Sequence, residues 1–207
     1  MGFSDLPPDP PTDFQGPPLP ALVSGTSGEF MGKKPLPRSI RDRKIVFILG
    51  PTGVGKSSVA QALAGNDCTH LSQKGVLDAI NFNARHREWK SELLLSACLI
   101  LECPCFLNRR PAALDGLQEL LRMRAGGERR TWVIEAQSGT AMDQVMGAVH
   151  PGYRATLVLR FPVGRGRLRF AKRICNDLGI PNSRAAATVH IDPWSYETVR
   201  QVLSEME

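Results

Sequence analysis

The segment Gly50-Pro51-Thr52-Gly53-Val54-Gly55-Lys56-Ser57 constrains the fold of this chain more than any other feature. Its spacing matches the Walker A pattern, and it lies between a continuous apolar run at 45–49 and a helical pattern that begins at Ser57. Glycines let successive backbone N–H groups turn toward one anion, and the start of a helix adds its positive dipole end. The sequence therefore predicts a P-loop that binds the phosphates of a nucleoside triphosphate.

The predicted ligands of this loop are ATP and Mg²⁺. Lys56 is expected to reach the β- and γ-phosphates, and the Ser57 hydroxyl is expected to ligate Mg²⁺. GTP is less favoured, because the chain has no Asn-Lys-x-Asp segment to read guanine. The predicted nucleotide-binding residues are Gly50, Pro51, Thr52, Gly53, Val54, Gly55, Lys56, Ser57 and Ser58.

A second acidic residue near the Mg²⁺ is expected at the end of another buried strand. Glu102 ends the apolar run Leu99-Ile100-Leu101 and would lie at the carboxyl edge of the sheet, where ligands of open α/β sheets bind. Glu135 ends the next apolar strand and is the alternative. Cys103 follows Glu102, and a neutral thiol is a poor activator of water. We therefore predict Glu102 as a metal ligand and assign no catalytic residue.

Strands and helices alternate from Lys44 onward, which implies right-handed crossovers and a parallel sheet. The predicted fold class is α/β, a three-layer P-loop NTPase sandwich with a mainly parallel sheet of five strands. These strands are placed at 45–49, 69–72, 97–101, 131–134 and 156–159. Helices are placed at 57–64, 76–82, 86–94, 114–126, 141–149 and 167–178, and a last helix is expected to open at Asp192 and Pro193.

The first 40 residues differ from the rest in composition. They contain nine of the 16 prolines, and such a segment buries too little apolar surface to offset the entropy of ordering. We predict a disordered tail over 1–40 and a nucleotide-binding core over 41–162. The sequence shows no signal peptide and no apolar run of membrane-spanning length, so a cytoplasmic protein without a membrane partner is expected.

The cysteines form no metal-type spacing, and their number is odd. We therefore expect reduced thiols that are mostly buried. The five residues are Cys68, Cys98, Cys103, Cys105 and Cys175.

Beyond the P-loop, the chain resembles an AAA+ ATPase domain of the DnaA and Hda type. The run 99–107 resembles that group's Walker B strand, and Trp132-Val133-Ile134-Glu135 falls where the group has its sensor 1 strand. Pro162, the basic helix after it and Leu178-Gly179-Ile180-Pro181 resemble the start of the lid. The resemblance implies a small C-terminal helical lid over 163–207 and an ATP-dependent regulatory role.

Several positions depart from the pattern of that group. Glu102 stands where the first Walker B aspartate is expected, and Cys103 stands at the second acid. Arg154 is a weak substitute for an arginine finger. Tyr196 falls near the expected sensor 2 arginine, and Arg200 lies about one turn later. These departures favour an ATP-binding module with weak or absent hydrolysis that switches a protein partner.

Two alternatives remain open for the function. In a small P-loop kinase, Arg165, Arg167 and Arg169 would clamp the transferring phosphoryl group in a lid. Glu102 or Glu135 would then lie near the acceptor. In a nucleic-acid-binding accessory ATPase, the basic helix would contact backbone phosphates. The net charge of +6 permits the second alternative, although a run of charges most often forms a solvated face.

Overall fold

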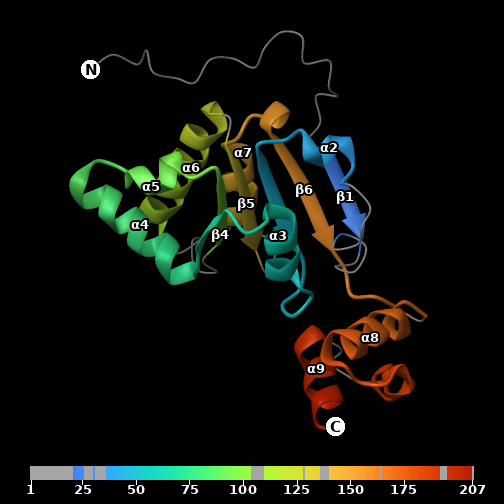
Figure 1. The fold of residues 1–207 in the computed structure, drawn as a ribbon. Helices are drawn as coiled ribbons and strands as arrows, with labels where there is room; N and C mark the ends of the chain where they lie inside the picture. Colours follow the sequence, from blue (N-terminus) through green and yellow to red (C-terminus); the bar gives the residue numbers. More distant parts are fainter. Residues whose placement is uncertain are drawn as a thin grey trace.

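The computed structural model describes residues 21–25, 30, 36–103, 110–127, 129–135, 140–163, 165–191 and 195–206. Its centre is one sheet of six strands in the order β1-β6-β2-β5-β4-β3 (Figure 1). All neighbouring strands in the sheet are parallel. The prediction of an α/β fold with a mainly parallel sheet is confirmed, with six strands in place of the predicted five.

The elements follow one another in the alternation that the sequence predicts. The strands are β1 Ala21–Gly25, β2 Ile45–Leu49, β3 Thr69–Leu71, β4 Cys98–Glu102, β5 Arg130–Glu135 and β6 Arg154–Leu159. The α-helices are α2 Arg38–Arg41, α3 Lys56–Ala64, α4 Gln73–His86, α5 Ser91–Leu95, α6 Pro111–Gly126, α7 Thr140–Gly147, α8 Arg165–Leu178 and α9 Tyr196–Ser204. Two 3-10 segments are η2 Pro151–Tyr153 and η3 Asn182–Thr188.

The helix predicted over 86–94 is divided in the structure. The helix α4 continues through His86 and ends at Arg87, whose φ of 56° is left-handed and stops the helix. The helix α5 then begins at Ser91 and ends at Leu95. The apolar periodicity continued across this break, so it did not reveal the change of direction.

Side chains of the central strands alternate between two apolar layers. In β2, Ile45 and Phe47 pack with residues of α4, α5, α6 and α7 on one face of the sheet. Val46 and Ile48 pack with residues of α2 and α3 on the other face. All five residues of β2 are buried, as expected for a strand covered on both sides. Three layers result, with the sheet in the middle.

The N-terminal strand β1 differs from the prediction of a disordered tail over 1–40. Residues 21–25 pair in parallel with β6, from Ala21 opposite Ala155 to Gly25 opposite Leu159. The helix α2 also lies in this range and buries Ile40 completely. The pairing joins segments far apart in the sequence, so local composition could not predict it. Residues 1–20, with the proline-rich segment, lie outside the described residues.

The elements α8, η3 and α9 form a C-terminal helical segment beyond the carboxyl ends of the strands (Figure 1). It has an apolar cluster of its own, which includes Ile174, Val199 and Leu203. Phe161 packs against both this cluster and the cluster under α3. Ser195 caps α9 by accepting a hydrogen bond from the Thr198 N–H at 3.0 Å. The cap predicted at Asp192 lies outside the described residues.

The buried side chain of Arg124 holds together the amino ends of the strands. Its guanidinium donates to the Thr131 hydroxyl at 2.6 Å and to the carbonyls of Leu93, Ser96 and Arg130 at 2.6, 3.0 and 2.9 Å. Burial lowers the pKa of Arg124 to about 10, which still leaves the group charged at neutral pH. The charge is stabilised by carbonyl dipoles of three segments that meet at this edge.

Candidate nucleotide-binding site

The P-loop lies at the carboxyl edge of the sheet, between the end of β2 at Leu49 and the start of α3 at Lys56. The backbone of Gly50, Gly53 and Gly55 has φ values of 154°, 76° and 87°. Side chains other than hydrogen are unfavourable at such φ values. The glycines of the motif are therefore required by the backbone path of the loop.

Gly50 also lies against the neighbouring strand. A Cβ atom at this position would be 2.7 Å from the Leu159 carbonyl oxygen of β6. Such a distance is far inside van der Waals contact, and the atom that it meets belongs to the backbone. The loop therefore packs directly against the end of β6.

The Lys56 side chain bends back over the loop. Its ammonium group donates to the carbonyls of Gly50 at 2.9 Å and Pro51 at 2.7 Å, and the residue is 8% exposed. These bonds hold the cation above the loop, where a bound phosphate would lie. The role predicted for Lys56 in phosphate binding stays a prediction.

Glu102 is brought next to the loop by the sheet. The Ser57 hydroxyl lies 3.5 Å from the Glu102 Oε1 atom, although the two residues are 45 positions apart. The Nε2 atom of His70, on β3, lies 3.2 Å from the same oxygen. The sequence did not predict this contact, because β3 and β4 become neighbours only in the folded sheet.

The Ser57 hydroxyl oxygen and the Glu102 carboxylate oxygens are ligands that suit a hard cation such as Mg²⁺. Within the described part of the chain, no three His, Cys, Asp or Glu side chains are grouped closely enough to hold a metal alone. Mg²⁺ commonly takes one or two protein oxygens and completes its shell with phosphate oxygens and water. One hydroxyl and one carboxylate beside a phosphate loop therefore fit Mg²⁺ bound together with a nucleotide.

A pocket of about 270 Å³ opens over the loop. Six of the predicted nucleotide-binding residues line it, together with Glu102. Its lining residues are Thr52, Gly53, Gly55, Lys56, Ser57, Ser58, Gln73, Glu102, Cys103 and Ile134. Val54 instead points into the core and is 3% exposed, while Gly50 packs against β6. Gln73, the first residue of α4, was not predicted, since nothing in its local sequence marks it as a pocket residue.

Cys103 lies at the base of this pocket directly after β4. It is 3% exposed, and its N–H donates to the Ile134 carbonyl at 2.8 Å. The backbone is thus fixed by the sheet, and the position next to Glu102 brings a thiol to the pocket rather than a carboxylate. Glu135, the alternative acid, ends β5 opposite Leu49, and its side chain is outside the described set.

The two arginines considered for nucleotide contact lie in different places. Arg154 starts β6 at the amino edge of the sheet, and its guanidinium donates to the Met146 carbonyl. Burial lowers the pKa of Arg154. Arg200 is exposed on α9. The Arg154 side chain therefore makes an internal contact at the amino edge of the sheet, opposite the P-loop.

Comparison with solved structures places this arrangement among known folds. Domain III of the Thermotoga maritima replication initiation protein DnaA has a TM-score of 0.65 at 12% identity, with 78% of this chain and 74% of that chain covered. The chain has a DnaA-like AAA+ fold. AMPPCP-bound DnaA from Aquifex aeolicus has a TM-score of 0.59 at 12% identity, with 78% and 54% covered. A replication initiator DnaA bound to AMPPCP and single-stranded DNA has a TM-score of 0.61 at 12% identity, with 79% and 55% covered.

The chain spans just over half the length of the latter two DnaA chains. No protein-family model matches the sequence, and no curated protein matches it. The AAA+ resemblance inferred from the P-loop and the strand pattern is confirmed at the level of the fold. Among the described helices, none combines the length and the apolar character needed to cross a membrane.

Proposed function

We propose that this chain is an ATP-binding, AAA+-like regulatory module with weak or absent hydrolysis, in which bound nucleotide changes a surface for a protein partner. The observation that carries the proposal is the composition of one pocket. A P-loop with Lys56 and Ser57 faces a metal-type acid, Glu102, which is followed by Cys103. Among the described residues that line the pocket, the groups for binding are present, and Cys103 stands at the position of the usual second acid.

The residues that would hold the nucleotide are those of the loop and the start of α3. Backbone N–H groups of the loop and the Lys56 ammonium would bind the phosphates. Ser57 and Glu102 would hold Mg²⁺, which supplies neutralisation of phosphate charge when bound. The AMPPCP in two DnaA structures of similar fold supports ATP as the nucleotide.

Weak hydrolysis is inferred from the groups around the pocket. Phosphoryl transfer depends mostly on positioning and electrostatic stabilisation, and the attacking water needs a residue that orients it. Cys103 brings no charge to that position, and Arg154 donates to the Met146 carbonyl instead of extending outward. The kinase alternative is less well supported, because Arg167 donates to the Pro162 and Val189 carbonyls within the C-terminal segment.

A path for partner switching runs from the P-loop to the C-terminal segment, which we interpret as a lid. Gly50 packs against Leu159, the last residue of β6. Two residues later, Phe161 contacts the apolar clusters of both the sheet and the lid. A nucleotide that reorders the loop would therefore shift the residues that set the position of the lid.

Calorimetric titration with ATP in the presence of Mg²⁺ tests the binding site. Lys56→Ala should weaken binding about 10- to 100-fold, because it removes a charge-assisted hydrogen bond to phosphate. Lys90→Ala is the matched control, since Lys90 lies over the Phe82 ring away from the pocket. Equal affinities of wild type and Lys56→Ala contradict the assignment.

A second titration tests the metal and the chemistry. Glu102→Gln should remove most of the gain in ATP affinity produced by Mg²⁺ and leave the affinity in EDTA unchanged. Glu119→Gln, at an exposed position of α6, serves as its control. ATP turnover measured alone should be very slow, and turnover that requires an added acceptor favours the kinase.

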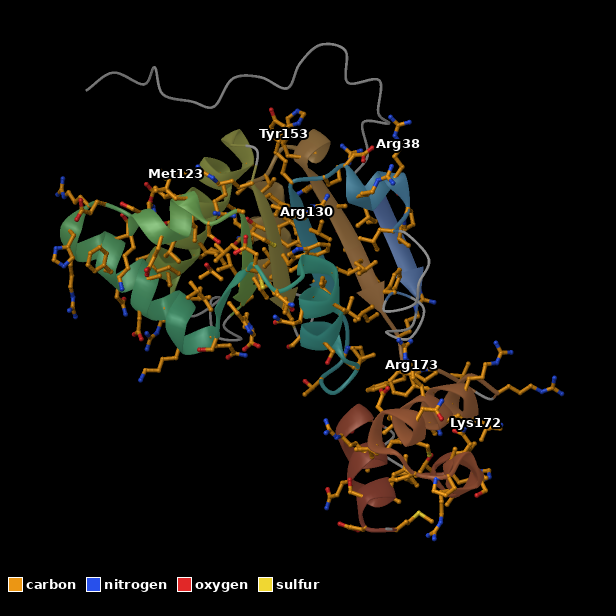
Figure 2. All side chains as sticks on the ribbon, viewed as in Figure 1. Arg38, Met123, Arg130, Tyr153, Lys172 and Arg173 are labelled. Atoms are coloured by element: carbon orange, nitrogen blue, oxygen red, sulfur yellow. The ribbon has the colours of Figure 1, made fainter. Side chains whose placement is uncertain are left out.

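Nucleic acid is a second candidate partner. The exposed face of α8 carries Arg165, Arg169, Lys172 and Arg173, at helical spacings that place them on one side of the helix. Lys172 and Arg173 are labelled in Figure 2. A DnaA of similar fold is bound to single-stranded DNA. We expect Arg169→Ala and Lys172→Ala each to make the salt dependence of oligonucleotide binding less steep, by about 0.7 in the logarithmic slope. Arg122→Ala, on α6, should leave the slope unchanged, and an unaltered slope in all variants excludes this face.

A further inference from the structure

Two cysteines lie at the amino ends of neighbouring strands, away from the nucleotide pocket. In the parallel pair β3–β4, Thr69 lies opposite Leu99, followed in register by His70 opposite Ile100. Cys98 is the first residue of β4, and Cys68 directly precedes β3. Continuing the register back by one residue places Cys68 opposite Cys98.

The two thiols are on the same face of the sheet. Cys98 belongs to the apolar cluster beneath α3, and Cys68 packs against that same cluster. Adjacent strands are about 4.8 Å apart, which is within the range of about 4.4–6.8 Å that Cα atoms of a disulfide span. Position and orientation therefore both suit a bond between the two sulfur atoms.

Hydrogen bonds hold the two strand starts together. The Thr69 hydroxyl lies 3.0 Å from the Ser96 hydroxyl, which also donates to the Cys98 carbonyl at 2.6 Å. The Cys68 thiol lies 3.4 Å from the Gly65 carbonyl, in the turn that follows α3. Closing a bridge here needs side-chain rotation rather than movement of a strand.

We propose that Cys68 and Cys98 are a redox-active pair that closes to a disulfide when a low-molecular-weight disulfide is the oxidant. The Cys68 thiolate attacks one sulfur of the oxidant, which releases one small thiolate and leaves a mixed disulfide on Cys68. The Cys98 thiolate then attacks the Cys68 sulfur and releases the second small thiolate. The two protein thiols lose two protons and two electrons, and the oxidant takes up both electrons.

The surroundings of the two thiols explain this order. Cys68 is half-buried and within reach of a small oxidant, while Cys98 is 9% exposed. Burial raises the pKa of the Cys98 thiol, and this effect outweighs the opposing hydrogen bond with Trp132. Cys98 therefore acts as the resolving thiol in the second step.

The bridge would enclose β3, α4 and α5 in a covalent loop. This loop carries His70, which contacts Glu102, and Gln73, which lines the pocket. Oxidation would fix these residues more firmly to β4. Disulfide formation does not depend on nucleotide binding, because the thiols lie at the amino edge of the sheet, opposite the P-loop.

The experiment oxidises the full chain with oxidised glutathione in the absence of nucleotide and identifies linked peptides by mass spectrometry. A Cys68–Cys98 linked pair should form in the folded protein, at least about tenfold more than in concentrated urea, where the loop must close against chain entropy. Cys68→Ser and Cys98→Ser should each abolish it. Cys175→Ser, in the core of the C-terminal segment, should retain it.

Hydrogen exchange on the wild-type chain gives a second measurement that needs no variant. Amides of β3 should exchange several-fold more slowly after oxidation, and added dithiothreitol should reverse the change. Absence of the linked pair, or equal linkage in folded and urea-unfolded protein, overturns the proposal. Unchanged exchange in β3 after complete linkage overturns its effect on the loop.

Discussion

Replacement of Gly50 by alanine tests the close packing between the P-loop and β6. The new Cβ atom would be 2.7 Å from the Leu159 carbonyl oxygen and 3.1 Å from a methyl carbon of Val54. The first contact is with backbone, so it is relieved only if the loop or the end of β6 moves. The φ of 154° adds strain for any residue with a side chain.

Two terms set the size of the expected effect. Backbone strain at such a position costs about 1–3 kcal/mol, and overpacking a well-packed site costs about 1–3 kcal/mol. We expect Gly50→Ala to lower the free energy of unfolding by about 3 kcal/mol, a large part of the total of about 5–15 kcal/mol that domains have. The nucleotide affinity should fall as well, because the same movement displaces the loop.

Alanine substitutions at two other glycines distinguish the cost of backbone strain from the cost of overpacking. Gly65 has a φ of 79° and a ψ of −168°, with open space around its Cβ position, so Gly65→Ala should cost only strain, about 1–3 kcal/mol. Gly147 ends α7 in open space, and Gly147→Ala should be neutral or stabilising by up to about 1 kcal/mol. Urea unfolding followed by circular dichroism gives all three values. If Gly50→Ala costs no more than Gly65→Ala, the packing argument is wrong.

The remaining predictions concern the N-terminal strand, the buried arginine and the pocket thiol. Deletion of residues 1–20 should leave the melting temperature unchanged, whereas deletion of 1–25 removes β1 and should lower it by about 2–8 °C; equal melting temperatures contradict a stabilising role for β1. Arg124→Met removes the donor of three carbonyls, at about 1–3 kcal/mol for each buried acceptor left unsatisfied. It should lower the free energy of urea unfolding by clearly more than Arg129→Met, which loses one bond. Cys103→Glu should raise ATP turnover at least about tenfold above that of the wild type and of Cys103→Ser. Rapid turnover by the wild type would contradict the role given to the thiol.

The parts of the fold that depend on short-range pattern could be predicted from the sequence. The apolar run of β2, the glycine spacing and the helix after Lys56 are contiguous, and their order alone identifies the P-loop. Glu102 was found in the same way, as a polar residue that ends a buried strand. The structure then places it 3.5 Å from Ser57, which a position at the carboxyl edge implies.

Features that depend on the pairing of strands far apart in the sequence could not be predicted. β1 is a short apolar segment, Ala21–Gly25, within proline-rich surroundings, and it forms a strand by pairing with the distant β6. His70 and Gln73 reach the site because β3 pairs with β4. Val54 fits the Walker A spacing like its neighbours, yet its side chain turns into the core, and only the folded loop distinguishes it.

Nucleotide binding and hydrolysis would make different demands on this pocket. Phosphate binding relies on backbone N–H groups and on Lys56, none of which depends on the residue after Glu102. Hydrolysis requires a group that orients water at that position, where the Cys103 N–H is fixed to β5 and the side chain is a thiol. The contact of Gly50 with Leu159 is also independent of Cys103, so a loop reordered by ATP can act on the lid without turnover. Under the proposed function, this pocket would report whether nucleotide is bound rather than consume it.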